Sequence, residues 1–431
     1  MTNADRPADT LVLGIDIGTS GVRIVAVDAS DRVVASAAVP MATPDRVGAR
    51  ITQDPEVWWN ATETALRQIL GTIDIACVRA IAVDGTSGTV LAVDEAGQPI
   101  GRASLYNDTC PPEIVARIDG VAPDGNAARG ATSALGRASA LQDQPGTVRI
   151  LHQADWIAAR LTGRFGTSDE NNALKTGYDP VERCWPDWIA ATGLRIGLLP
   201  KVVAAGTPIG PIGVKAQAAF GLEPTTLVVA GTTDGCAAFL ATGATALGEG
   251  VTSLGSTLVL KLLCDAPIFA PAYGIYSHRI GDMWLAGGAS NSGGTALLGF
   301  FTAEQMRALE PELDANTPTG LDYYPLPGPG ERFPINDPAL PSRCEPRPAS
   351  DAAFFQGLLE GVAGVEALGY RRLAELGGPP LVSIRTVGGG ANNAAWSRIR
   401  SRLTGVALLP PAHGEAACGA AWLARRGLDA A

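Results

Sequence analysis

The sequence is poor in charged side chains and has no apolar run long enough to cross a membrane. Charged residues make up 18% of the 431 residues, apolar residues make up 46%, and the formal net charge is -10. A nucleic-acid binder needs clustered Lys and Arg, so this composition disfavours that class. No apolar run reaches the roughly 18 residues of a membrane span. The composition therefore predicts a core-rich globular protein with no nucleic-acid and no membrane partner.

Cysteine pairs and a targeting segment are also missing. The seven cysteines are scattered and form no CxxC pair, which indicates reduced thiols rather than a disulfide frame or a zinc site. The opening "MTNADRPADT" lacks the basic-then-apolar order of a signal peptide. We therefore expect a cytoplasmic protein. No G-x-x-x-x-G-K-[ST] motif occurs, which excludes a P-loop nucleotide hydrolase.

Apolar periodicity predicts an α/β chain that repeats one plan. Short β-branched runs predict an antiparallel meander at 11–15, 22–28 and 32–39. A helix is expected over 55–70, where apolar residues recur every four positions. A second cycle starts near Leu227, and we place the domain boundary there, giving domains 10–225 and 226–431.

The second half continues with strands, glycine turns and helices. Strands with a hairpin are expected within 226–263, a long helix over 352–377, and a strand, glycine loop and helix over 381–405. The proline-rich stretch 325–348 shows no packing period and is interpreted as a surface excursion. Two such halves would face each other across a cleft.

Each half begins with a hairpin rich in glycine and hydroxyl residues. In the first, "DIGTSG", the turn carries Gly18, Thr19 and Ser20 after Asp16. This pattern is either a plain turn or a nest of backbone N–H groups for phosphate oxygens. In the second interpretation, Asp16 holds Mg²⁺ through water, since that ion keeps much of its hydration shell. The second hairpin carries Gly255, Ser256 and Thr257 but no carboxylate.

Two further stretches each allow two interpretations. Asp234 ends an apolar strand, so it either caps the following helix or acts as a general base on a substrate hydroxyl. "VGGGANN" at 387–393 follows a strand and precedes a helix, but Asn393 stands where the G-x-G-x-x-G fingerprint requires its third glycine. This loop is either a tight turn or a surface on which a nucleotide can lie.

The ordered set of motifs resembles the FGGY family of carbohydrate kinases, which belongs to the actin-like ATPase superfamily. The resemblance covers nearly the whole chain. Its motifs are "GIDIGTSGVR", "AVDGTSGTVLAVD", "LYND", "HQADWIAARLTG", "GTTDG", "VTSLGST" and "VGGGANNAAW". Within the family, stretches such as "DGTSGT" and "DENNALKTGYDP" look most like the D-ribulokinase branch.

The resemblance implies a fold and a role for each motif residue. The fold is two ribonuclease-H-like domains with mixed sheets flanked by helices and a cleft between them. Asp234 would be the catalytic base, and Asp16 would organise Mg-ATP. The remaining implied contacts are Gly18, Thr19 and Ser20 with the γ-phosphate, Gly255, Ser256 and Thr257 with the β- and γ-phosphates, Gly389, Gly390 and Asn393 with adenosine, and Asp84, Gly85, Thr86 and Ser87 with the sugar.

The expected activity is transfer of the γ-phosphate of ATP to the 5-hydroxyl of a ketopentose, most simply D-ribulose. The alternatives are D-xylulose, another ketose or polyol, and an actin-like ATPase switch without a sugar acceptor. A dinucleotide oxidoreductase rests only on residues 388–393. The expected partners are ATP, Mg²⁺ and a small ketose or polyol, for a monomer or a homodimer.

Overall fold

The computed structural model describes residues 10–431, and residues 1–9, to which the absence of a signal peptide refers, lie outside them. The chain forms two compact units. The first ends at Ala241 and also contains Glu415–Ala431, and the second is Thr242–Gly414. The expected boundary at 225/226 therefore lies inside the first unit. The physical reason is that β13 (Leu227–Thr233) pairs in parallel with β6 (Val78–Gly85) of the same sheet.

The main sheet of the first unit has the order β12-β13-β6-β1-β2-β3. In chain order, the first three strands of this sheet are β1 (Leu11–Ile17), β2 (Gly21–Val27) and β3 (Val33–Pro40). They pair antiparallel, which confirms the predicted meander. β12 (Pro208–Pro211) forms the opposite edge. Alternating apolar residues of β1 pack with α1 (Pro55–Leu70), α4 (Gln153–Thr162) and α7 (Val214–Phe220) into one core.

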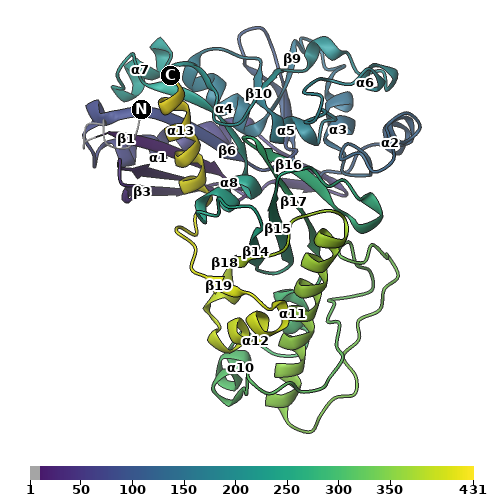
Figure 1. Ribbon diagram of the computed structural model, residues 1–431. Coiled ribbons are helices and arrows are strands. Elements are labelled where there is room, and N and C mark those ends of the chain that lie inside the picture. Colours follow the sequence, from purple (N-terminus) through teal and green to yellow (C-terminus); the bar gives the residue numbers. More distant parts are fainter. Residues whose placement is uncertain (1–9) are drawn as a thin grey trace. The chain divides into compact units, whose positions relative to one another are not determined.

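The other face of this sheet contacts α8 (Asp234–Ala241) and α13 (Ala416–Ala430). Figure 1 shows α13, in yellow, alongside the purple β1, although they lie at opposite ends of the sequence. Glycine permits this approach, because a Cβ at Gly14 would lie 1.8 Å from the carbonyl oxygen of Ala417. The last helix of the chain is therefore part of the first unit.

The first unit also carries a five-stranded sheet and short helices. The sheet has the order β4-β5-β8-β7-β9, and a two-stranded sheet pairs β10 with β11. These elements are β4 (Asp45–Val47), β5 (Arg50–Gln53), β7 (Val90–Val93), β8 (Pro99–Ser104), β9 (Arg149–His152), β10 (Thr167–Asp169), β11 (Lys201–Val203), α2 (Pro112–Asp119), α3 (Ala134–Leu141), α5 (Glu170–Leu174) and α6 (Trp188–Ala191).

The second unit repeats the plan with a sheet ordered β16-β17-β15-β14-β18-β19. Leu258, Leu260 and Leu262 of β15 pack against Leu358 and Val362 of the long helix α11. The elements are β14 (Glu249–Leu254), β15 (Leu258–Cys264), β16 (Tyr276–Ile280), β17 (Met283–Ser290), β18 (Ser383–Val387), β19 (Ala407–Leu409), α9 (Gly294–Leu298), α10 (Ala303–Leu309), α11 (Asp351–Glu375) and α12 (Ala394–Thr404).

The proline-rich stretch 325–348 departs from its prediction as a surface excursion. Phe333 is fully buried and packs into the core of the second unit. Glycines make room for its ring, because a Cβ at Gly288 would lie 2.6 Å from it. The sequence pattern did not predict this contact, because the segment is irregular and a single buried residue produces no periodic apolar pattern.

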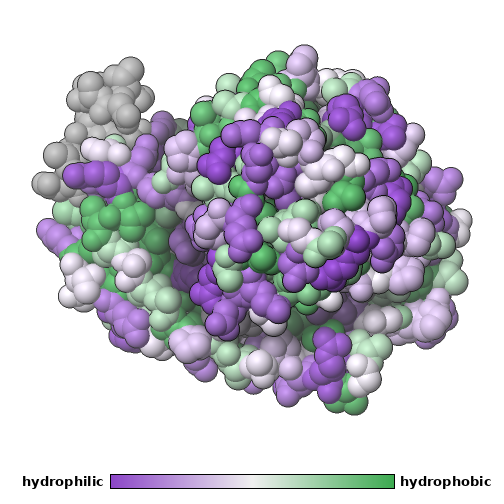
Figure 2. Space-filling view, turned by 90° about the horizontal axis from the view of Figure 1, so that it is seen from below, coloured by the Kyte–Doolittle hydropathy of each residue, from purple (hydrophilic) through white to green (hydrophobic). Residues whose placement is uncertain are grey.

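The exposed apolar side chains are dispersed. Val47, Val214 and Leu298 are among the most exposed of them and lie far apart in the sequence. In the view of Figure 2, hydrophilic and hydrophobic side chains intermingle over the surface. Within residues 10–431, no helix is both long enough and apolar enough to cross a bilayer.

Candidate active site

Three aspartates meet at the carboxyl edge of the first unit's main sheet. Asp16 lies beside Asp84 in the parallel register of β1 and β6, and Asp84 lies beside Thr232 of β13. Asp234 is the first residue of α8, directly after β13. The carboxyl groups of Asp16 and Asp84 are close enough to shift each other's pKa, and the charge of Asp234 acts on both. The structure thus brings the predicted residues Asp16, Asp84 and Asp234 together in the first unit.

Burial dominates the electrostatics of this cluster. Asp84 is 0% exposed, and loss of solvent together with the charge of Asp16 raises the pKa of its carboxyl well above the usual value. The pKa of Asp16 is also raised, mainly by burial. Arg23 counteracts this rise, with its Nη1 3.4 Å from Oδ2 of Asp16. The site therefore concentrates negative charge that a proton or a cation must balance.

A magnesium ion fits the chemistry of these groups. Within the described residues, neither carboxyl oxygen of Asp84 has a hydrogen-bond donor, and carboxylate oxygens are the ligands that Mg²⁺ prefers. The same part of the chain contains no group of three or more acidic, His or Cys side chains arranged to hold a metal. An ion here would therefore take one or two carboxylates and complete its shell with water and phosphate oxygens.

The first hairpin projects beyond this edge. The N–H of Gly18 donates to the carbonyl of Gly21 at 3.0 Å, which closes the β1–β2 turn. Thr19 and Ser20 are exposed at its tip. Their hydroxyl and N–H groups are accessible to a ligand, as a phosphate nest requires.

The stretch 84–87 is anchored to the first turn of α4. The N–H and hydroxyl of Thr86 both donate to Oε1 of Gln153, at 2.9 and 2.8 Å. Gly85 packs against the same turn, where a Cβ would lie 3.1 Å from that oxygen. Ser87 is half-buried, and its hydroxyl has no hydrogen-bond partner in the described chain. Of these four residues, Asp84 joins the carboxylate cluster and Ser87 keeps a hydroxyl for a ligand.

The second unit holds a pocket of about 780 Å³ between its hairpin and its glycine loop. Five predicted residues line it together, namely Gly255, Ser256, Gly389, Gly390 and Asn393. Thr257 is not among the lining residues and pairs through its carbonyl with the N–H of Gly255. The remaining wall is largely apolar, with Leu297, Met306, Phe355, Leu359 and Trp396. A flat heteroaromatic group with a polar tail suits such a pocket.

Glycine backbone shapes this pocket. Gly388 has φ +89°, and a Cβ there would lie 2.7 Å from the carbonyl oxygen of Leu254, so the loop runs directly beside the hairpin. Asn393 caps α12 by accepting from the N–H of Trp396 at 2.7 Å. Asn393 is thus a helix cap whose position borders the pocket, which a sequence motif alone does not reveal.

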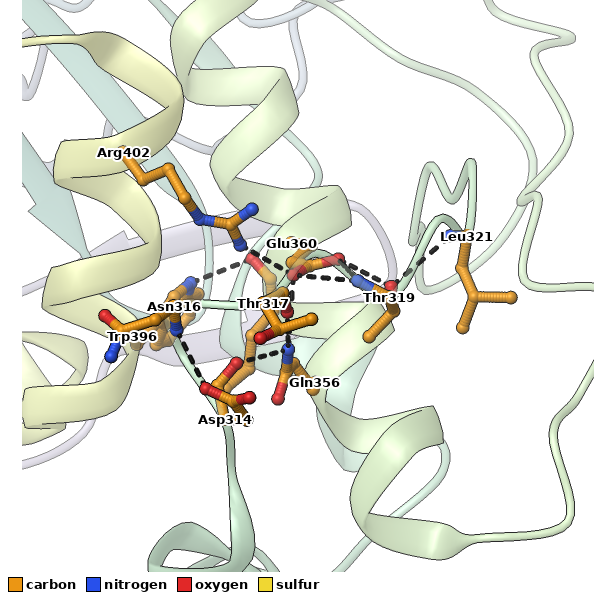
Figure 3. Close-up of polar contacts among 10 residues, drawn as sticks. Asp314, Asn316, Thr317, Thr319, Leu321, Gln356, Glu360, Trp396 and Arg402 are labelled. Carbon is orange, nitrogen blue, oxygen red and sulfur yellow. Dashed lines mark hydrogen bonds and ion pairs between the residues drawn. The ribbon is translucent and has the colours of Figure 1, made fainter.

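A buried network fixes α12 against α11 beside the pocket. Figure 3 shows Arg402 of α12 and Thr319 of the preceding loop converging on Glu360 of α11. The distances to the Glu360 carboxylate are 2.7 Å from Nη2 of Arg402 and 2.5 Å from the hydroxyl of Thr319. The indole N–H of Trp396 donates to the carbonyl of Leu359 at 3.0 Å. The Trp396 side chain of the pocket wall is therefore tied to α11.

Sequence reasoning missed three contributors to these sites. Gln153 was overlooked because it lies far from Thr86 in the sequence. Trp396 falls in the first turn after the glycine loop, and an aromatic residue at that position is a usable signal. Arg23 lies opposite Asp16 in the register of the β1–β2 hairpin. Counting residues outward from the turn would have identified this pair.

Comparisons with known proteins match nearly the whole chain to two domains of one family. Residues 11–129 and 141–241 match the N-terminal domain, and residues 250–428 the C-terminal domain, of the FGGY family of carbohydrate kinases. An autoinducer-2 kinase of Yersinia pestis (strain Pestoides F) is 27% identical, covering 95% of this chain and 84% of the relative.

Two solved structures share the fold. One, a xyloylose kinase from Brucella ovis, has a TM-score of 0.87 and 24% identity, with 98% of this chain and 91% of that chain covered. The other, a gluconate kinase from Lactobacillus acidophilus, has a TM-score of 0.86 and 18% identity, with 98% and 90% covered. The two matched domains show that the chain belongs to the FGGY family of carbohydrate kinases.

Proposed function

We propose that this carbohydrate kinase transfers the γ-phosphate of ATP to the 5-hydroxyl of a ketopentose, D-ribulose. The observation that carries the proposal is the aspartate cluster at the carboxyl edge of the first sheet, with Asp234 as its accessible member. Asp234 is half-buried, whereas Asp84 is fully enclosed. A general base must reach the substrate hydroxyl within hydrogen-bond distance, so Asp234 is assigned this role.

The chemical step needs little covalent work from the protein. The carboxylate of Asp234 takes the proton of the 5-hydroxyl as that oxygen forms its bond to the γ-phosphorus. The bond from phosphorus to the β,γ-bridging oxygen breaks, and ADP leaves. The N–H of Gly235 donates to Oδ1 of Asp234 at 2.7 Å, which holds the carboxylate in one orientation and leaves its second oxygen for the proton.

The phosphates and the adenosine are assigned to the two hairpins and the glycine loop. Gly18, Thr19 and Ser20 donate to the γ-phosphate, and Gly255, Ser256 and Thr257 bind the β- and γ-phosphates. Adenosine lies in the 780 Å³ pocket along Gly389, Gly390 and Asn393. Bound Mg²⁺ would supply neutralisation of phosphate charge, and Asp16 and Asp84 are the side chains that would hold it.

The acceptor is the part of the proposal that needs a direct test. D-Ribulose is favoured by the stretch "DGTSGT" (84–89), and Ser87 is assigned to the sugar. The test is an ATP-consumption assay with D-ribulose, D-xylulose, pentitols, glycerol and gluconate, followed by NMR assignment of the phosphorylated carbon. We expect the highest kcat/KM with D-ribulose and phosphate on C5. A higher value with another acceptor overturns the substrate assignment, and hydrolysis that no acceptor stimulates favours an ATPase switch.

A further inference from the structure

A fully buried ion pair in the Thr242–Gly414 unit connects the strand before the second hairpin to the helix after the glycine loop. Glu366 of α11 and Arg400 of α12 are 0% and 1% exposed. Nε and Nη2 of Arg400 donate to the two oxygens of the Glu366 carboxylate at 2.6 and 2.7 Å. The hydroxyl of Thr252 on β14 donates to the same carboxylate at 2.5 Å. One carboxylate therefore joins α11, α12 and β14.

Tyr370 of α11 holds the Thr252 hydroxyl from its other side. The phenol oxygen of Tyr370 lies 3.0 Å from the hydroxyl oxygen of Thr252. Since the Thr252 proton points to Glu366, the phenol donates this second bond. Burial and the charge of Glu366 raise the pKa of Tyr370, so the phenol keeps the proton that it donates. The hydroxyl of Thr252 thus has one fixed donor and one fixed acceptor.

These contacts lie directly behind the two parts of the unit that are assigned to ATP. Thr252 comes three residues before Gly255 of the second hairpin. On the neighbouring parallel strand β18, which leads into the glycine loop, Thr386 is opposite Thr252 in register. Arg400 belongs to α12, which follows that loop and contributes Trp396 to the pocket wall. The hairpin and the glycine loop therefore share one buried anchor.

Stability alone does not account for this anchor. A buried ion pair adds little net stability, because the loss of water around two charges offsets their attraction. Its directional bonds instead fix one arrangement of the groups that they join. Thr386 shows the contrast, because it is also buried and its hydroxyl has no hydrogen-bond partner in the described chain. A threonine at this level of the sheet therefore does not need such a network to be accommodated.

We propose that Thr252 is a positioning residue, which through Glu366 and Arg400 sets the second hairpin relative to the glycine loop, so that a nucleotide bound by its adenosine meets the hairpin with its β-phosphate. The proposal rests on the proposed function, which assigns these two parts to phosphates and adenosine. Misplacement by about 1 Å can cost on the order of 10²-fold in rate, so the spacing matters for ADP and ATP. AMP has no β-phosphate and is insensitive to it.

The test is calorimetric titration of the full chain with Mg-ADP, alone and with AMP as competitor, which yields both dissociation constants. Thr252→Val keeps the shape of the side chain and removes its hydroxyl. We expect it to weaken ADP by on the order of tenfold, the effect of losing a hydrogen bond to a charged group, while the affinity for AMP changes little. In steady-state kinetics, kcat/KM for ATP should fall in parallel and KM for the acceptor should stay the same. Thr252→Ser keeps the hydroxyl and should restore the preference for ADP.

The matched control is Thr386→Val, which removes a buried hydroxyl without a partner at the same level of the sheet and should leave both affinities unchanged. Tyr370→Phe removes only the donor to Thr252, and we expect a smaller loss of ADP affinity, about threefold, which tests the network even if Thr252→Val does not fold.

Equal losses of ADP and AMP affinity in Thr252→Val and Tyr370→Phe would mean a purely structural role and overturn the proposal. An unchanged preference for ADP in both variants would overturn it as well. These results leave the assignment of the hairpin to phosphates intact. A wild-type protein that binds ADP no more tightly than AMP overturns that assignment itself, so the two failures are distinguishable.

Discussion

At the scale of single residues, Asp234 and Asp84 show how a difference in burial suits two aspartates of one site to different roles. Both lie at one edge of one sheet, but Asp84 is 0% exposed and burial raises the pKa of its carboxyl well above the usual value. Asp234 keeps partial exposure and a single backbone donor. In the absence of a bound cation, a buried acid with a raised pKa tends to hold its proton, whereas an accessible carboxylate can accept one from a substrate.

The replacement Asp234→Asn tests this division of roles. The amide keeps the shape of the side chain but removes the basicity, and general-base catalysis typically contributes ~10²–10⁴-fold. We expect kcat with the best acceptor to fall within that range, while KM for ATP and for the acceptor change little. Steady-state kinetics and nucleotide titration of the same preparation measure both. Near wild-type turnover would contradict the assignment of Asp234 as the base.

A second prediction concerns the buried carboxyl of Asp169. Burial and the neighbouring charge of Asp155 raise its pKa from 3.8 to about 6. The folded state therefore holds this proton more tightly than the unfolded state. The protonated carboxyl contributes its full stabilisation to the folded state below about pH 4, and this contribution is lost as the pH rises through about 6. The loss amounts to on the order of 2–3 kcal/mol. Urea unfolding between pH 4 and 8 measures it.

The matching variant is Asp169→Asn, which cannot titrate. Oδ1 of Asp169 accepts from the N–H groups of Asn171 and Asn172, and an asparagine retains that cap. Oδ1 of Asn172 has no hydrogen-bond partner in the described chain, so its amide can rotate to meet the new NH₂ group. We expect a flatter stability profile between pH 4 and 6. An unchanged profile would assign the pH dependence to other groups.

At the scale of elements, the contact between β1 and α13 depends on glycine at position 14. A Cβ there would lie 1.8 Å from the carbonyl oxygen of Ala417 and 2.3 Å from the backbone nitrogen of Ala421. Both atoms belong to helix backbone, which cannot move aside as a flexible side chain can. The helix must therefore shift as a whole if position 14 acquires a side chain.

We predict that Gly14→Ala lowers the free energy of unfolding by about 3 kcal/mol, the upper part of the range for overpacked cores. Gly197→Ala is the control, because a Cβ at that position has no neighbour within 4 Å. Thermal and urea unfolding of the two variants provide the comparison. Equal stability of both variants would mean that α13 is not held against β1 in solution.

At the scale of the whole molecule, the sequence predicted local elements better than their assembly. The meander, the helix at 55–70 and the long helix after 350 follow from apolar periodicity, and the structure has them as β1 to β3, α1 and α11. The return of α13 to the first unit leaves no local signal, since it depends on Gly14 and Ala417, which lie far apart in the sequence. The burial of Phe333 was missed for the same reason.

The candidate site was likewise predicted only in part from the sequence. The motifs identified Asp16, Asp84 and Asp234, and the structure places them at one edge because the carboxyl ends of parallel strands share it. They did not reveal that Asp84 is enclosed, since solvent access depends on every neighbouring element.

The chain enters and leaves the second unit at one place, where the N–H of Ala412 donates to the carbonyl of Thr242 at 2.9 Å. Because α13 follows residue 414 in the chain, the second unit is fully synthesised before α13 leaves the ribosome. The sheet of the first unit, although made earlier, lacks its covering helix until then. Domains generally fold as units during translation, so the half that is translated first is expected to be the half that finishes folding last.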